Sequence, residues 1–162
     1  MHSIYKHLIY KFNMKKILLL IVLAISAVSM KAQERAFGAD LNLGFGTPVG
    51  FGIGAKYHHG FNDDWRATGD VKYLFANMNV LELDANINYL FDLGTTDAKI
   101  YPLAGIGLWS WFGEGGGAHM IFNLGAGVDW PLGDNWYANA EFAFKFWDGS
   151  RENLSVGLMY KF

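Results

Sequence analysis

The sequence predicts an all-β chain, an eight-stranded antiparallel up-and-down transmembrane β-barrel preceded by a cleaved signal peptide. Three observations support this fold class. Hydrophobic residues make up 52% of the chain and aromatic residues 17%, which is rich for a soluble domain. After Glu34, apolar and polar residues alternate with a period of two. The alternation restarts about every dozen residues, between clusters of Gly, Asp, Asn and Pro.

The N-terminal segment has the three parts of a secretory signal. Lys15 and Lys16 form a positive start, residues 17–28 form an apolar run, and small residues lead up to Ala32. The apolar run is shorter than the ~20 residues that a transmembrane helix needs, so we expect cleavage after Ala32. The expected organisation is residues 1–13 as a mis-assigned upstream start, residues 14–32 as the signal peptide and residues 33–162 as the barrel.

Eight strands are expected in the mature chain. Their ranges are residues 35–45, 49–58, 65–76, 80–91, 99–109, 120–130, 136–147 and 153–162. Each has ten residues or slightly more, which matches the ~9–11 that a tilted strand needs to cross a bilayer and exceeds the usual ~5–6 of soluble proteins. Pro48 and Pro131 fall in expected turns, and Pro102 falls near a strand start, where a missing N–H is tolerated.

One face of each strand is apolar and the other polar. In residues 80–91, for example, Leu81 and Leu83 alternate with Glu82 and Asp84. A soluble barrel would place the apolar face inside. The polar face, however, combines Gly and Asn with charges of both signs, as a crowded interior would, and the other face is long and uncharged.

The inward charges are expected to form a nearly balanced network in the lumen. Its members are Asp40, Lys56, Arg66, Asp70, Lys72, Glu82, Asp84, Asp129, Glu141, Lys145 and Lys161. Such charges can gate ions, but a buried unpaired charge is costly, which favours structural pairing. A small eight-stranded barrel also has little room for a channel.

Aromatic residues cluster at strand ends, as in the interfacial girdles of membrane barrels. The girdle residues expected from the sequence are Trp65, Tyr89, Trp109, Trp130 and Trp136. An even number of strands places both barrel termini on one side, which we expect to be the periplasm. The connections on the other side are then residues 46–48, 77–79, 110–119 and 148–152, all of them short.

The last strand carries a more specific pattern. Phe162 closes the sequence, and apolar residues alternate behind it. They are Leu154, Val156, Leu158 and Tyr160. With the acidic turn, Trp and alternating strand in GFNDDWRATGDVKY and PLGDNWYANAEFAF, residues 35–162 resemble the OmpA/OmpX-like eight-stranded outer-membrane barrels, the porin-like outer-membrane β-barrel domain family. The resemblance implies that the C-terminal residues are the signal read by the barrel assembly machinery.

Several classes of site are disfavoured. The absence of Cys excludes disulfides, thiolate chemistry and a lipoprotein anchor. In the expected mature chain, from residue 33 onward, the Ser and His residues are His58, His59, His119, Ser110, Ser150 and Ser155. No His lies two residues from a Ser on one strand face, so a hydrolase triad is not expected. Adjacent His58 and His59 point to opposite faces and cannot readily share a metal ion. We therefore expect no catalytic residue, cofactor or metal.

The pattern as a whole indicates an integral protein of the outer membrane of a Gram-negative bacterium, structural or surface-interacting and not an enzyme. The partners expected are outer-membrane lipid and the assembly machinery, with the protein itself a monomer. From Gln33 onward eight basic residues face fifteen acidic ones, so nucleic acid is not an expected partner. Three alternatives stay open: a narrow passive pore for ions or small solutes, a lipid A-modifying enzyme, and a secreted lipid-binding barrel.

Overall fold

The computed structural model describes residues 34–46, 49–75, 79–94, 96–112, 115–147 and 149–162. The expected signal peptide (residues 14–32) and the expected upstream start (residues 1–13) lie outside these ranges. In the part of the chain that is described, no helix is long and apolar enough to cross a membrane.

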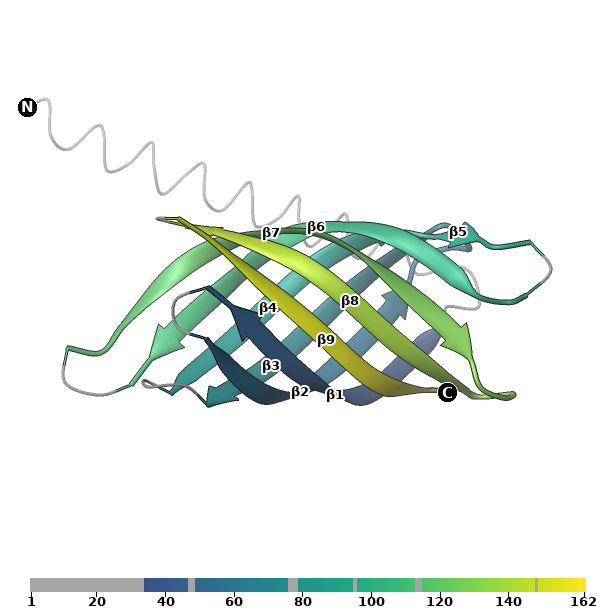
Figure 1. Ribbon diagram of the computed structural model, residues 1–162. Helices are drawn as coiled ribbons and strands as arrows, with labels where there is room; N and C mark the ends of the chain where they lie inside the picture. Colours follow the sequence, from purple (N-terminus) through teal and green to yellow (C-terminus); the bar gives the residue numbers. More distant parts are fainter. Residues whose placement is uncertain (1–33, 47–48, 76–78, 95, 113–114, 148) are drawn as a thin grey trace, which may run out of the picture. The chain divides into compact units, whose positions relative to one another are not determined.

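The described chain folds into antiparallel strands that follow one another around a closed barrel (Figure 1). The strands are β1 (Arg35–Phe45), β2 (Gly50–Gly60), β3 (Trp65–Phe75), β4 (Val80–Tyr89), β5 (Phe91–Asp92), β6 (Lys99–Trp111), β7 (Gly117–Pro131), β8 (Trp136–Trp147) and β9 (Gly149–Lys161). The two-residue β5 continues β4 beyond Leu90, and both pair with β6. Counted together as one strand, they give a barrel of eight strands. The predicted fold class, an eight-stranded antiparallel barrel, is confirmed.

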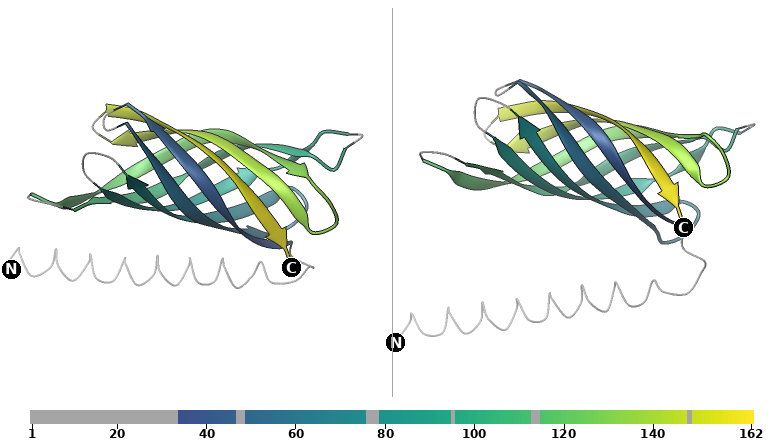
Figure 2. Two further views of the ribbon diagram at one scale, coloured as in Figure 1. Left: turned by 60° about the horizontal axis from the view of Figure 1, so that its bottom comes forward. Right: turned by 90° about the horizontal axis from the view of Figure 1, so that it is seen from below.

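Closure comes from the pairing of β1 with β9 and of β4 with β6 (Figure 2). Successive pairing partners once around the wall are Arg35, His59, Ala67, Ile87, Ala104, Leu124, Phe144, Glu152 and Phe45. The path returns to β1 ten residues beyond its start. With ~3.3 Å per residue and ~4.8 Å between strands, this stagger tilts the strands by about 40°. An eleven-residue strand then rises roughly 27 Å along the barrel axis, close to the ~25 Å apolar band of membrane barrels.

The barrel has two ends, which we name by what they hold. At the terminal end β1 begins and β9 ends, and at the loop end β1 ends and β2 begins. Along β1, exposed and buried residues alternate without a break: Phe37 and Leu41 are exposed, and Asp40 and Asn42 are buried. The outer wall is therefore apolar and the interior polar, the reverse of a soluble barrel.

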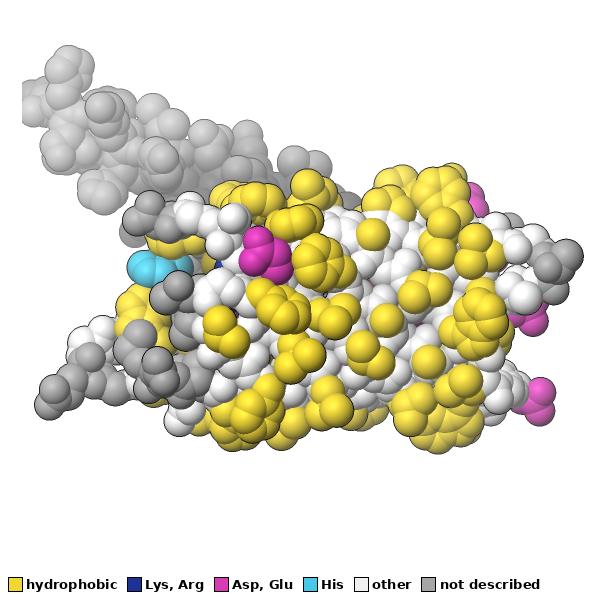
Figure 3. All heavy atoms as spheres, in the orientation of Figure 1, with side chains coloured by type: hydrophobic (Ala, Val, Ile, Leu, Met, Phe, Trp, Pro, Cys, Tyr) yellow, Lys and Arg dark blue, Asp and Glu magenta, His cyan; other side chains and the backbone are white. Residues whose placement is uncertain are grey.

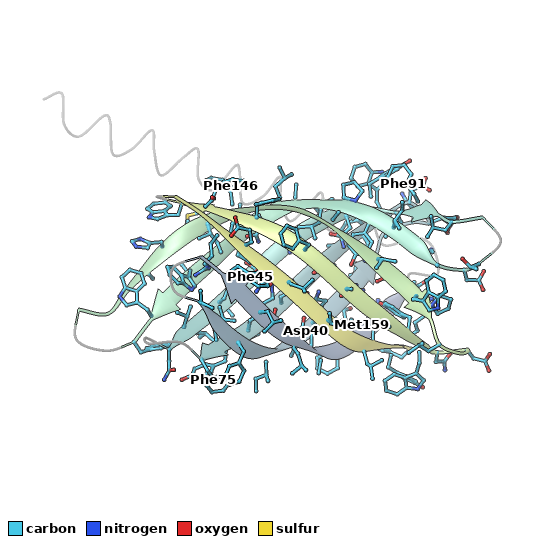
Figure 4. All side chains as sticks on the ribbon, viewed as in Figure 1. Asp40, Phe45, Phe75, Phe91, Phe146 and Met159 are labelled. Atoms are coloured by element: carbon cyan, nitrogen blue, oxygen red, sulfur yellow. The ribbon has the colours of Figure 1, made fainter. Side chains whose placement is uncertain are left out.

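The views with side chains show the same division. Hydrophobic side chains are spread over the face of the wall drawn in Figure 3, and several acidic side chains lie at its terminal end. In Figure 4, Phe75, Phe91 and Phe146 project from the wall, and Asp40 lies on its inner side. Closure also pairs the backbone groups of neighbouring strands with each other, as the membrane interior demands.

Two of the expected loops are shorter in the structure. The stretch 110–119 was expected to be a loop, but Trp111 pairs with Gly117 and His119 lies within β7. The stretch 148–152 was also expected to be a loop, but β9 begins at Gly149, which pairs with Trp147. Gly149 adopts φ of 124°, a conformation that glycine takes without strain and that lets the chain reverse at once.

Candidate functional site

The barrel interior is the candidate functional site, because its chemistry distinguishes this barrel from a plain membrane wall. The buried polar and charged residues outnumber the buried hydrophobic ones among the residues described, and eleven of them carry a formal charge. The charged ones are Asp40, Lys56, Arg66, Asp70, Lys72, Glu82, Asp84, Asp129, Glu141, Lys145 and Arg151. Six acids thus face five bases inside one narrow lumen.

Toward the terminal end, the interior is organised around Lys56, which is fully buried. Its ammonium forms an ion pair with Glu141 and donates to the side-chain oxygen of Asn139 at 2.9 Å. Asp40 and Asp70 each place a carboxylate oxygen 3.7 Å from the same nitrogen. We call these four charged residues the Lys56 network. One cation therefore offsets three carboxylates that come from different strands.

A second set of bonds joins this network to Arg66. The Tyr101 hydroxyl donates to Glu141 at 2.8 Å, and the Asn139 amide donates to Asp129 at 2.7 Å. Asp129 in turn forms an ion pair with Arg66, whose guanidinium lies 4.5 Å from the centre of the Tyr101 ring. The terminal half of the lumen is thus filled by connected side chains.

Toward the loop end, Lys72, Glu82, Asp84, Lys145 and Arg151 form what we call the Glu82 network. Lys145 lies 2.6 Å from Glu82 and 2.7 Å from Asp84. Lys72 lies 2.9 Å from Asp84, and Arg151 lies 3.2 Å from Glu82. Here three cations surround two acids, opposite to the excess of acid in the Lys56 network. The two imbalances offset each other over the length of the lumen.

Two asparagines connect the two networks. Asn123 donates to Asp84 and to Asn86, both at 2.9 Å, and Asn86 donates to Asp70 at 3.4 Å. Beside Glu82 and Arg151 is a cavity of about 10 Å³, which is space for about one water molecule. A polar vestibule of about 430 Å³ opens at the terminal end, with Asp129 and Tyr137 in its lining. The middle of the lumen is occupied by side chains.

Ten of the eleven residues expected in the lumen are buried there, and Lys161 is not among them. Its side chain is 37% exposed and lies 3.0 Å from Glu34 at the terminal end. Arg151, in contrast, belongs to the interior but was assigned to a loop by the sequence. Because β9 begins earlier than expected, Arg151 is part of this strand, and it points inward like the alternate residues Asn153 and Ser155.

The expected girdle residues separate into two groups. Trp65 packs against Tyr89 at 4.9 Å, and Trp130 and Trp136 are half exposed on the outer wall of the same terminal end. Trp109 differs from the expectation. It shares the inward parity of Tyr101, and the guanidinium of Arg151 lies 3.9 Å above its ring. Because β6 extends to Trp111, Trp109 does not lie at the end of its strand.

The C-terminal residues expected to act in assembly lie on the outer wall. Val156, Leu158 and Tyr160 are exposed, Leu154 is partly exposed, and Phe162 is 69% exposed. The Phe162 amide donates to the Arg35 carbonyl at 3.0 Å, which holds the end of the chain against β1. These side chains therefore form one apolar row along β9.

The Ser and His residues do not assemble into a catalytic group. His58 bonds the Tyr137 hydroxyl at 2.7 Å inside the barrel, and His119 stacks between aromatic rings. Ser155 lies 3.5 Å from Lys56. Across the described ranges no hydrogen bond joins a His to a Ser, and no group of three potential ligands is arranged to hold a metal ion.

Comparison with known proteins gives matches in structure alone. No known family and no curated protein sequence matches the chain. The N-terminal β-barrel domain of Pseudomonas aeruginosa OprF aligns with a TM-score of 0.63 at 13% identity, over 81% of this chain and all of that domain. This chain has the fold of an eight-stranded outer-membrane β-barrel.

Two further structures have the same fold. Neisserial surface protein A aligns with a TM-score of 0.61 at 18% identity, over 80% of this chain and 97% of its own. Ail, the attachment invasion locus protein of Yersinia pestis, aligns with a TM-score of 0.54 at 17% identity, over the same shares of the two chains. At these identities the likeness extends to the fold and not to side chains.

Proposed function

We propose that this protein is an integral outer-membrane β-barrel of a Gram-negative bacterium, with a structural or surface-interaction role, a lumen closed by ion pairs and no catalytic activity. The observation that carries the proposal is the pairing of the lumen charges. Lys56 is paired with Glu141 and Glu82 with Lys145, and both Lys56 and Glu82 are fully buried, which supports a lumen closed to water and ions. Two proteins of similar fold are named for cell surfaces or attachment, which agrees with a surface role.

The closed lumen is tested by conductance. Purified protein reconstituted in a planar lipid bilayer is expected to give no unitary current steps, because moving an ion through would require breaking several buried ion pairs. A known porin added afterwards to the same bilayer supplies the positive control. Regular steps from this protein would instead establish the narrow pore, which the polar vestibule at the terminal end favours as the second candidate.

Orientation is a second element of the proposal, with both barrel termini in the periplasm and the loop end outside the cell. The chain contains no Cys, so a single introduced Cys reports its own exposure. Ser150 is exposed at the loop end and Asp134 at the terminal end. On intact cells, a membrane-impermeant maleimide should label Ser150→Cys, and should label Asp134→Cys only after the outer membrane is permeabilised. The reverse pattern would invert the orientation.

We also propose that the apolar row of β9 is read during insertion, with outer-membrane lipid as the permanent partner. The row faces outward along its whole length and ends on the exposed Phe162. A monomer suffices for this arrangement, because the wall closes on itself and, in the residues that the structure describes, leaves no unpaired strand edge for a second copy.

A further inference from the structure

Four rings line the inner side of the wall at the loop end, and we call them the mouth cluster. They are Trp109, Trp111, His119 and Trp147, contributed by β6, β7 and β8. His119 lies between two indoles, with ring centres 4.6 Å from Trp111 and 5.0 Å from Trp147. Trp109 and Trp111 are 5.9 Å apart. The rings thus form one row of stacked and tilted aromatic rings across three neighbouring strands, with Trp147 at its end.

The lipid girdle does not explain these rings. In β6, residues 101 and 103 are buried inside, and Trp109 and Trp111 share their parity. In β8, Trp147 shares the parity of the buried Lys145. Lipid contacts the opposite face of each strand. The mouth cluster therefore faces the aqueous mouth of the barrel, and its outermost ring, Trp147, is 55% exposed.

Trp147 is exposed beside three partly exposed rings, and exposed apolar side chains that gather in this way mark binding sites. Polar atoms lie at its edges. The Trp109 indole N–H is buried and has no partner in the described chain, and the His119 imidazole carries two ring nitrogens. A matching ligand presents flat C–H faces to the rings and hydroxyl groups to the polar edges.

The charges around the mouth further limit the class of ligand that can bind there. The described Lys and Arg residues at this end are Lys72, Lys145 and Arg151, and all three are buried in the Glu82 network. Arg151 is engaged on both sides, by Glu82 and by the Trp109 ring. An anionic ligand would find no free cation among them. The site is therefore suited to a neutral ligand.

We propose that the mouth cluster binds a neutral oligosaccharide, with sugar rings stacked on Trp147 and Trp111. Sugar C–H groups carry partial positive charge and are attracted to the negative face of an indole ring. The inference rests on the proposed surface role for the source of the sugar, which would be outside the cell. The binding itself depends only on the geometry of the loop end.

The experiment measures binding to the purified barrel in lauryldimethylamine oxide, a detergent without a sugar headgroup. Saturation-transfer NMR reports the binding of maltohexaose and chitotetraose, with dextran sulfate as the anionic comparison. We expect at least one neutral probe to bind. Trp147→Ala and Trp111→Ala should each weaken that binding by about tenfold, since each removes one stacking surface.

Trp136→Ala is the matched control, because Trp136 is also half exposed, at 50%, but lies on the outer wall at the other end. It should bind the probe as the unmodified protein does. The heat-dependent gel shift of each variant checks that the barrel is folded. The proposal is overturned if neither neutral probe binds, if only dextran sulfate binds, or if folded Trp147→Ala binds the neutral probe unchanged. Labelling of Ser150→Cys only in permeabilised cells would overturn the surface role and leave the sugar site standing.

Discussion

Replacing Lys56 by Met is expected to lower the free energy of unfolding by about 3–5 kcal/mol, because the change leaves buried carboxylates without their cation. Glu141, Asp40 and Asp70 all lie within 4 Å of the Lys56 ammonium. Methionine is similar in length and apolar, so the change removes the charge with little change in volume. Urea denaturation in phospholipid vesicles, followed by tryptophan fluorescence, measures the loss.

Lys161→Met supplies the matched control, since Lys161 forms an ion pair with Glu34 that is partly exposed at the end of the barrel. Exposed pairs contribute about 0–1 kcal/mol, so this variant should unfold almost as the unmodified protein does. Adding Glu141→Gln to Lys56→Met removes one of the stranded charges and should recover part of the lost stability. If Lys56→Met unfolds like Lys161→Met, the Lys56 network does not hold the lumen together.

Strand positions could be predicted from the sequence because the two faces of each strand contact different environments. Lipid outside and a polar lumen inside impose opposite demands on alternate residues, and the alternation of Asp40 and Asn42 with Leu41 and Leu43 is the result. The same demand fixes register, since a slip of one residue would bury Leu41 and expose Asp40 to lipid. The inward location of Glu82 and Asp84 follows from the same alternation.

Strand ends were harder to predict. The alternation of apolar and polar residues is required only where lipid contacts one face of a strand, so it gives no guidance where the chain leaves the membrane. Trp109 and Arg151 illustrate this. Both lie at the loop end, where an aromatic or charged residue suits water, lipid headgroups or the lumen equally well. Their inward position depends on a hairpin that extends to Trp111 and on a reversal at Gly149, and the stacking of Arg151 on Trp109 joins strands distant in sequence.

The partners inside the lumen could not be predicted from one sequence either. Parity places Lys56, Asp70 and Glu141 inside, but which acid meets which base depends on the stagger of the closed wall. The ten-residue offset brings Glu141 of β8 across the lumen to Lys56 of β2. That offset is a property of all eight pairings together, so no single strand contains it.

Replacing Leu41 by Arg is expected to destabilise the barrel by about 2–4 kcal/mol in a bilayer, the cost of an arginine near the midplane of the lipid face. Leu41 is 68% exposed at the middle of β1, between Ile53 on β2 and Val156 on β9. In a water-soluble barrel the same exposure would make this change almost neutral. The sign and size of the effect therefore report which solvent the outer wall contacts. Urea denaturation in vesicles measures it.

Val49→Arg is the comparison that isolates depth, because Val49 is 70% exposed but lies just before β2 at the loop end. An arginine there reaches headgroups and water, and its expected cost falls to about 0–1 kcal/mol. A large cost at Leu41 with a small cost at Val49 requires a low-dielectric layer around the middle of the wall. Equal and small costs at both positions would mean that water contacts the middle of β1, and the membrane location would then be wrong even though the barrel itself is closed.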